Sequence, residues 1–181
     1  MTNNSVQSVV RRAEEKDLPA LTEINLACFS GNQGGPDSAR QWMECRLNSF
    51  PLYQVFVLEV DGEVVGYIGW EIHGGFQRPL PVVELEQIGL MPSFQDKGLG
   101  GILQNDSMAA VAEWVRDNNK RIESQINFIV WVYSGNLRAI ASYMKIFSDG
   151  VVGMRTQYGG RSEVMLRHQL SHVVDVPREE R

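Results

Sequence analysis

Residues 82–118, VVELEQIGLMPSFQDKGLGGILQNDSMAAVAEWVRDN, decide the fold of this 181-residue chain. Aliphatic and polar residues alternate at the start, which predicts a partly buried strand over Val82–Leu90 that Pro92 closes. A glycine-rich turn comes next. Apolar residues then recur at spacings of three and four, which is typical of an amphipathic helix. The segment therefore predicts a strand, a turn and a long helix in that order.

The register of this strand decides which side chains share a face. With a two-residue period, one face carries Glu84, Glu86, Ile88 and Leu90, and the other carries Leu85, Gln87 and Gly89. A bulge would change this division. We expect one at Gly89, because a glycine inside a strand often marks a bulge.

The glycine-rich turn, residues 95–101, reads QDKGLGG and lies at the start of the predicted helix. Missing side chains let a ligand approach the backbone, and the free N–H groups of a first helical turn favour an anion such as a pyrophosphate. Lys97 adds a positive charge beside them. Standing alone, such a turn is equally consistent with a tight connection that binds nothing.

Length and composition are those of a globular protein. With 43% hydrophobic and 22% charged residues, the 181-residue chain is large enough to bury a core. The same composition excludes a disordered or fibrous protein. We expect a single domain over residues 1–170 and a charged C-terminal tail over residues 171–181.

Charge and motif content exclude several classes of protein. A net charge of −5 argues against a nucleic-acid partner, which would require clustered cations. The N-terminus lacks the regions of a secretory signal, and the longest apolar run is too short to span a membrane, so we expect a cytoplasmic protein. Cys28 and Cys45 lie in no metal-ligand spacing and the histidines are scattered, so we expect no metal.

The flanking sequence supplies the remaining elements. Before residue 82, the patterns predict a strand, two helices and a hairpin turned by Asp61-Gly62. After residue 118, they predict a central strand buried on both faces, a helix and a final hairpin. The expected order is β-α-α-β-β-β-α-β-α-β-β, an α/β protein with a mixed sheet. The expected bounds are 7–12, 17–29, 38–48, 53–60, 63–72, 82–90, about 99–118, 125–133, 136–147, 151–158 and 162–170.

Two motifs in this order resemble those of a known family. Gln95-x-x-Gly98-x-Gly100 after a strand resembles the acetyl-coenzyme A loop of the GCN5-related N-acetyltransferase (GNAT) superfamily. A second family pattern is matched by Val132, Asn136, Ala139 and Tyr143. The order of elements over residues 8–170 is also that of a GNAT domain, although the Gly-Phe that usually follows the last helix is missing. The resemblance implies the GNAT acyl-CoA N-acyltransferase fold and acetyl-CoA as co-substrate.

The resemblance also implies roles for individual residues. Tyr143 would donate a proton to the departing thiolate, with a packing role as the alternative. The main chain of Ile88 and Leu90 would pair with pantetheine, and Asn136 would lie near the cofactor. Phe29 and Asn32 would touch the acceptor, unless they belong to an ordinary surface loop. The turn residues expected at the cofactor are Gln95, Asp96, Lys97, Gly98, Leu99, Gly100 and Gly101.

Glu84 and Glu86 are the candidates for a general base. An amine with a pKa of about 10 is mostly protonated at neutral pH and must lose a proton before it attacks a thioester. Either carboxylate could accept that proton directly or through water, and partial burial would raise its pKa toward a useful range. Glu84 precedes Gln95 by eleven residues, a separation found in some family members. Both residues are equally consistent with surface carboxylates in salt bridges.

We therefore expect an N-acetyltransferase that passes the acetyl group of acetyl-CoA to a primary amine of a small molecule or peptide, by direct attack in a ternary complex. A non-catalytic acyl-CoA-binding regulatory module is the alternative, because fold does not fix function. A Rossmann-type nucleotide-binding domain is a third reading, weakened by three antiparallel-looking strands before the glycine turn. The amine acceptor stays open, and a homodimer is common in the superfamily.

Overall fold

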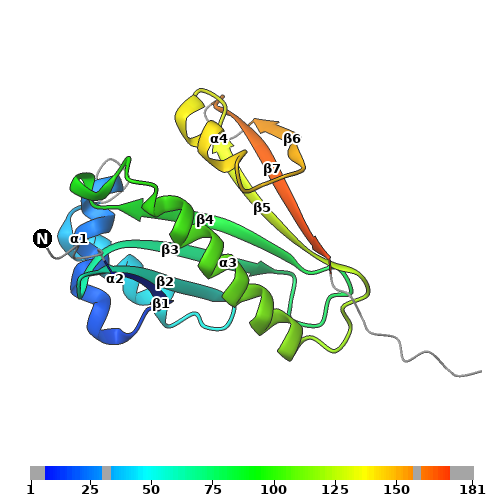
Figure 1. Cartoon of the computed structure of the whole chain (residues 1–181), viewed down its shortest axis with the longest axis horizontal. Coiled ribbons are helices and arrows are strands. Elements are labelled where there is room, and N and C mark those ends of the chain that lie inside the picture. Colours follow the sequence, from blue (N-terminus) through cyan, green and yellow to red (C-terminus); the bar gives the residue numbers. More distant parts are fainter. Residues whose placement is uncertain (1–6, 30–33, 157–159, 172–181) are drawn as a thin grey trace, which may run out of the picture.

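The computed structural model describes residues 7–29, 34–156 and 160–171. Seven strands form one sheet in the order β1-β2-β3-β4-β5-β7-β6 (Figure 1). The strands are Ser8–Arg12 (β1), Tyr53–Val60 (β2), Glu63–His73 (β3), Val82–Leu90 (β4), Gln125–Tyr133 (β5), Gly150–Thr156 (β6) and Ser162–Ser171 (β7). The α-helices are Leu18–Phe29 (α1), Pro36–Leu47 (α2), Leu99–Asn118 (α3) and Leu137–Tyr143 (α4). This confirms the expected order of elements.

The pairing of β4 with β5 differs from the rest of the sheet. These two strands are parallel, whereas every other neighbouring pair is antiparallel. A Rossmann sheet is mainly parallel, so this topology excludes the nucleotide-binding alternative. The parallel pairing runs only from Val82↔Asn127 to Leu85↔Val130, and the two strands then separate (Figure 1). One edge of β4 is thereby left open beyond Leu85.

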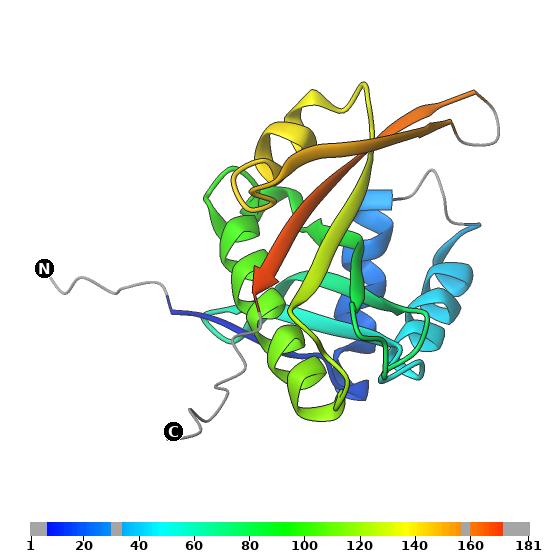
Figure 2. The ribbon, with the colours of Figure 1, turned by 90° about the vertical axis from the view of Figure 1, so that its right-hand side faces the viewer.

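Helices cover the sheet on both faces (Figure 2). α3 packs on one face, where Leu103 and Val111 join an apolar cluster with Phe128 of β5. α1 and α2 pack on the other face, where Leu21 and Met43 belong to a second cluster. Burial of these apolar surfaces holds helices and sheet together. Among the helices of the described ranges, none combines the length and apolar character needed to cross a membrane.

β4 contains a bulge at Glu86. Its neighbour β3 pairs Trp70 with Leu85 and then Gly69 with Gln87, which leaves Glu86 as the additional residue. Because a bulge places two consecutive side chains on nearly the same side, Glu86 and Gln87 both face α1 and α2.

The expected division of β4 side chains is therefore wrong beyond the bulge. Glu84 and Glu86 share a face, but Ile88 and Leu90 join the cluster beneath α3 on the opposite face. Gly89, where we expected the bulge, is instead a position of close packing. A Cβ atom at Gly89 would lie 3.2 Å from Cys28 Sγ, so its missing side chain lets α1 approach the sheet.

β5 is buried on one face only, which corrects the expectation of burial on both. Residues alternate along the strand between buried and half-buried or exposed positions. Phe128 and Val130 are among the buried ones. Trp131 lies on the more open face, where the Arg155 guanidinium lies 4.1 Å from the centre of its ring. Because Trp131 is large and aromatic, the run of residues predicted burial on both faces, although the face that carries Trp131 is the more open one.

The last helix is shorter than expected. α4 ends at Tyr143, whereas the apolar spacing predicted a helix to Phe147. The Tyr143 carbonyl accepts hydrogen bonds from the N–H groups of Ile146 (2.9 Å) and Phe147 (2.8 Å), so the chain continues in tight turns. Phe147 is fully buried, which explains its place in the apolar pattern.

Candidate active site

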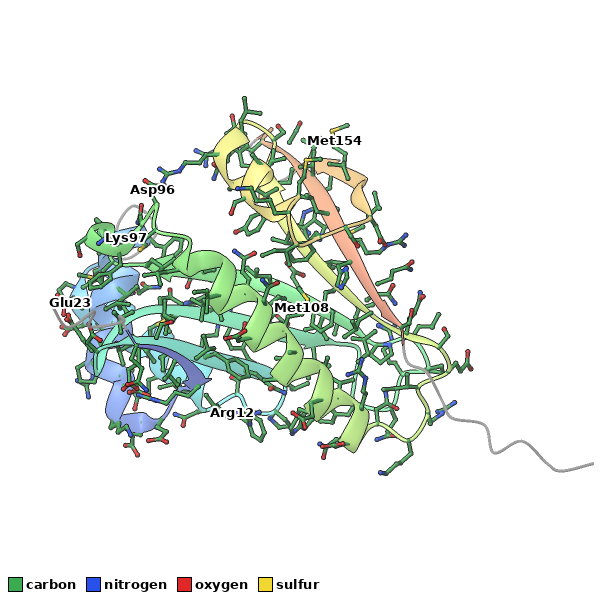
Figure 3. The ribbon with its side chains drawn as sticks, in the orientation of Figure 1. Arg12, Glu23, Asp96, Lys97, Met108 and Met154 are labelled. Carbon is green, nitrogen blue, oxygen red and sulfur yellow. The ribbon has the colours of Figure 1, made fainter. Side chains whose placement is uncertain are left out.

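The separation of β4 from β5 opens a cleft of about 900 Å³. The glycine loop and the start of α3 form one wall, α4 forms the other, and the end of α1 contributes Phe29. Asp96 and Lys97 lie on the loop that faces α4 (Figure 3). Within the described ranges, no three His, Cys, Asp or Glu side chains gather closely enough to hold a metal ion.

The glycine loop brings bare backbone to the cleft. Gly98 has a φ of +79°, in the left-handed region, and forms the N-cap of α3 without any side-chain cap. A Cβ atom at Gly98 or Gly101 would meet nothing within 4 Å and would project into open space. Uncapped N–H groups of a first helical turn are suitable donors to an anion. The loop therefore fits a pyrophosphate group.

Two residues of β4 direct backbone groups toward the open edge. Met91 N–H donates a hydrogen bond to the Val65 carbonyl of β3 (2.9 Å). In an antiparallel pair, alternate residues bond to the neighbouring strand, so Ile88 and Leu90 direct their N–H and C=O groups away from β3. Both residues line the cleft. They can pair with an extended polar chain as a neighbouring strand would.

The carbonyl of Leu90 already has partners. It accepts hydrogen bonds from Gln95 Nε2 (2.9 Å) and from Cys28 Sγ (3.2 Å). Gln95, expected at the cofactor, therefore also ties the glycine loop to the end of β4. Burial raises the pKa of the Cys28 thiol, so the thiol stays protonated and serves as a donor.

The opposite wall carries Asn136 and Tyr143. Asn136 Oδ1 accepts a hydrogen bond from Ala139 N–H (3.2 Å) and so caps α4. Tyr143 lines the cleft and packs edge-on against Phe147, with ring centres 6.0 Å apart. Burial raises the pKa of Tyr143 to about 12, so the phenol keeps its proton at neutral pH and is able to donate it.

Glu84 lies next to the point where β4 and β5 separate. It pairs with Ile129 of β5, one position before the last paired residues. Its Oε2 lies 2.8 Å from His73 Nε2 of β3. Burial raises the pKa of Glu84, and the hydrogen bond to His73 opposes part of this shift. A carboxylate with a raised pKa is a better proton acceptor than an ordinary one.

Glu86, on the bulge, is held by two donors. Tyr53 Oη donates to its Oε2 (2.6 Å) and Arg46 Nη2 donates to its Oε1 (3.3 Å). The Arg46 guanidinium lies over the rings of Trp42 (4.3 Å) and Tyr53 (4.4 Å). Tyr53 crosses β3 at Gly69, where a Cβ atom would lie only 2.0 Å from the tyrosine oxygen. Both carboxylate oxygens of Glu86 therefore have partners within the protein.

The structure brings together most of the site residues expected from the sequence. The cleft is lined by Phe29, Ile88, Leu90, Gln95, Asp96, Gly98, Gly100, Gly101, Asn136 and Tyr143. The lining does not include Glu84, Glu86, Lys97 or Leu99. Lys97 Nζ lies over the Phe94 ring (5.2 Å), and Leu99 packs into the cluster beneath α3. Asn32 lies outside the described residues.

Sequence reasoning missed four polar residues of the lining: Gln104, Arg138, Ser142 and Lys145. Arg138 on α4 forms an ion pair with Asp96 on the glycine loop. Gln104 is only 3% exposed on α3. The sequence carried a signal for Gln104, because it is a polar residue within the apolar stripe of its helix. Arg138 follows Asn136 in the family motif, but no spacing rule distinguished it from a surface arginine.

This arrangement has counterparts among known proteins. The sequence pattern of the Acetyltransferase (GNAT) family matches residues 18–147, which is most of the chain. The chain belongs to the GNAT acetyltransferase family. An uncharacterized N-acetyltransferase from the pepI 3′ region of Lactobacillus delbrueckii subsp. lactis is 28% identical over 116 residues, which cover 57% of this chain and 67% of that relative.

Solved structures share the fold of this GNAT protein. The ribosomal-protein-S18-alanine N-acetyltransferase from Escherichia coli superposes with a TM-score of 0.67 at 19% identity, over 93% of this chain and 97% of the other. Aminoglycoside N-acetyltransferase AAC(6′)-Iy, in complex with CoA, superposes with a TM-score of 0.66 at 17% identity, over 87% and 97%. These likenesses confirm the GNAT fold expected from the sequence.

Family membership makes this GNAT protein an acetyl-CoA-dependent N-acetyltransferase. When bound, acetyl-CoA supplies an activated thioester whose acetyl group can pass to an amine. The glycine loop, with its uncapped helix start, and the open edge of β4 fit the polar parts of this molecule.

Proposed function

We propose that this GNAT acetyltransferase acetylates a primary amine of a small molecule or peptide, by direct attack within a ternary complex. One observation carries the proposal: the glycine loop and Tyr143 lie on opposite walls of one cleft, beside the open edge of β4. Donor binding and proton donation would therefore occur in one space, which is what positional catalysis requires.

The proposed donor site relies mainly on backbone groups. N–H groups at residues 98–100 would hold the pyrophosphate, because the Gly101 N–H already donates to the Gly98 carbonyl (3.1 Å). The main chain of Ile88 and Leu90 would hold the pantetheine arm. Because the Leu90 carbonyl is occupied by Gln95 and Cys28, the groups that remain are the Leu90 N–H and both backbone groups of Ile88.

We propose that Tyr143 donates the proton that the leaving thiolate takes up. The Tyr143 side chain, which carries the hydroxyl group, lines the cleft. Its raised pKa, about 12, keeps the phenol protonated across the physiological range. General acid catalysis requires that protonation state and proximity to the leaving atom.

We propose Glu84 as the general base, with Glu86 as the second candidate. Burial raises the pKa of Glu84, and His73 is its neighbour at 2.8 Å. Glu86 is less suited because Tyr53 and Arg46 already bond to its two oxygens. Glu84 does not line the cleft, so its proton transfer would run through water.

The acceptor would enter beside the end of α1. Phe29 lines the cleft there, and Glu84 and Glu86 face the same side of the sheet. The Glu84 carboxylate on this side would favour the approach of a cationic amine, whereas the charge of Glu86 is already paired with Arg46. Asn32, expected to contact the acceptor, lies outside the described residues.

We further propose a single domain over residues 1–170, a cytoplasmic location and a homodimer. The shared sheet of β1 to β7 supports the single domain. The acidic composition and free cysteines support a cytoplasmic location.

The edge strand β6 supports a dimer, because it carries exposed Val151 and Met154. Sedimentation tests the dimer, which we expect Met154→Glu to weaken; a monomeric wild type would contradict it.

Calorimetry followed by a thiol-release assay tests the proposed activity. Purified protein is titrated with acetyl-CoA, and free thiol is then measured across a library of amines and peptides. Acceptor-dependent release supports an N-acetyltransferase and identifies its substrate. Binding without release for any amine favours the non-catalytic regulatory alternative, and absence of binding rejects the assignment of the cleft.

A further inference from the structure

In the described part of the chain, four buried side-chain atoms lack a hydrogen-bond partner, on Asn25, Trp42, Gln54 and Gln104, and of these four residues only Gln104 lines the cleft. It lies four residues after Gly100 on α3 and lines the cleft. Its side chain is 3% exposed, and its buried Oε1 has no hydrogen-bond partner among the described residues. Burial of a carbonyl oxygen without a donor is unfavourable. The arrangement therefore indicates that a donor comes from elsewhere.

Ser107, the next buried polar residue on the same face of α3, has hydrogen-bond partners for its hydroxyl group. Ser107 Oγ accepts a hydrogen bond from Trp70 Nε1 (2.9 Å) and donates one to the Leu103 carbonyl (2.6 Å). Ser107 is fully buried and does not line the cleft. Gln104 differs from it in both respects, since it borders the cleft and lacks a donor. The missing donor is therefore to be sought in the cleft.

Gln104 lies in the cleft where the proposed donor site would place the pantetheine arm. It lies five residues beyond Leu99, which places it about 7.5 Å along α3 from the start of the helix. The arm of coenzyme A continues from the pyrophosphate, carries two amide N–H groups and ends at the sulfur. Because Gly98, Gln104 and Tyr143 line the same cleft, an arm that runs from the helix start toward Tyr143 would come close to Gln104. Met108, one turn further along α3, is buried in the apolar cluster (Figure 3).

We propose that Gln104 Oε1 accepts a hydrogen bond from an amide N–H of the pantetheine arm. Gln104 is thus a positioning residue for the acyl donor. The proposal rests on the donor site described above and adds a side-chain contact from α3 to the backbone contacts of β4. Among the described residues of the free protein this oxygen has no donor and is closed to solvent, so we expect the terminal amide to turn toward the cleft, where the bound arm supplies the donor.

Gln104→Met tests the contact, because methionine keeps the length and volume of the side chain without its polar atoms. Calorimetry compares coenzyme A with adenosine 3′,5′-bisphosphate, which contains the nucleotide but no pantetheine arm. We expect the affinity for coenzyme A to fall about tenfold, the value of one buried hydrogen bond. The affinity for the bisphosphate is expected to stay unchanged. The Tm of the free variant is expected to equal or exceed that of the wild type, because the unmatched oxygen is gone.

Asn105→Ala is the matched control, because Asn105 is the exposed neighbour on the same helix and both affinities are expected to remain. An unchanged affinity of Gln104→Met for coenzyme A would overturn the proposal. Equal losses for both ligands would also overturn it, since Gln104 would then act on the helix start. A wild type that fails to bind coenzyme A rejects the donor site itself, whereas normal wild-type binding with an insensitive variant rejects only the role of Gln104.

Discussion

Arg138 of α4 and Asp96 of the glycine loop form an ion pair that joins the two walls of the cleft. Both side chains are mostly exposed, at 71% and 77%. Exposed ion pairs contribute little to stability because water screens them. The pair therefore matters mainly because it fixes the Arg138 guanidinium and the Asp96 carboxylate beside the glycine loop.

Opposite effects on donor affinity are expected from the two partners of this pair. Arg138→Ala removes a cation near the space proposed for the pyrophosphate, so the affinity for coenzyme A is expected to fall about threefold. Asp96→Asn frees the guanidinium and removes a repulsive carboxylate, so the affinity is expected to rise. Calorimetry at low and high salt measures both, and the differences should shrink at high salt. If Asp96→Asn weakens binding as much as Arg138→Ala, the pair supports the loop and does not recruit phosphate.

Gly98→Asp is expected to abolish coenzyme A binding. The φ of +79° at Gly98 is unfavourable for a side chain, and the new carboxylate would project into the space proposed for the pyrophosphate. Gly62→Asp is the matched control, because Gly62 has a φ of +87°, equal open space and a place in the β2–β3 hairpin. Calorimetry and thermal unfolding distinguish the two. Equal loss of affinity in both variants would show a general effect on folding.

Tyr143→Phe is expected to lower kcat by about a hundredfold or more without weakening donor binding. Phenylalanine keeps the edge-on packing against Phe147 and removes only the hydroxyl. Turnover with the best amine, together with calorimetry, separates the two effects. Tyr133→Phe is a suitable control, since Tyr133 is exposed and lies outside the cleft lining. Unchanged turnover in Tyr143→Phe would leave Tyr143 with only a packing role.

The pH dependence of kcat/KM tests Glu84. A general base works only when ionised, so activity is lost as pH falls through its pKa, which burial raises above the ordinary 4.5. The hydrogen bond to His73 lowers that pKa, so His73→Ala is expected to move the acid limb to higher pH. Glu84→Gln is expected to remove this limb and most of the rate. If the limb stays in place in Glu84→Gln and disappears in Glu86→Gln, Glu86 is the base.

The sequence was sufficient to predict the features that depend on residues close together along the chain. Val82–Leu90 has the bounds that alternation predicted, and Gln125–Tyr133 has the bounds that its β-branched and aromatic run predicted. The glycine loop and Tyr143 were found because motif spacing along one chain is visible without a structure. They lie in one cleft because β4 and β5 separate beyond Leu85.

Features that depend on contacts between distant segments could not be predicted. The bulge lies at Glu86, where Tyr53 and Arg46 from two other elements hold the carboxylate. Alternation along β4 alone cannot reveal those partners. For the same reason Gly89 was interpreted as a bulge, although its small size serves the approach of α1 near Cys28.

Gly69 is a position where the close approach of Tyr53 requires glycine. A Cβ atom there would lie 2.0 Å from Tyr53 Oη, 2.5 Å from Cζ and 2.8 Å from Cε1. Tyr53 is 4% exposed and donates the 2.6 Å hydrogen bond to Glu86. Gly69→Ala therefore forces the ring out of its place and breaks that bond.

We expect Gly69→Ala to lower the free energy of unfolding by about 2–4 kcal/mol, as overpacking and a lost buried hydrogen bond together do. Tyr53→Leu alone is expected to cost about 2–4 kcal/mol, because it removes a buried ring. In the double variant no tyrosine ring is left for the new Cβ atom to displace. The decrease in the free energy of unfolding of the double variant is therefore expected to be clearly smaller than the sum of the decreases in the two single variants. Urea unfolding of the four proteins measures this coupling. Additive losses would mean that the ring and the backbone at Gly69 do not compete for the same space, and that Glu86 is held in some other way.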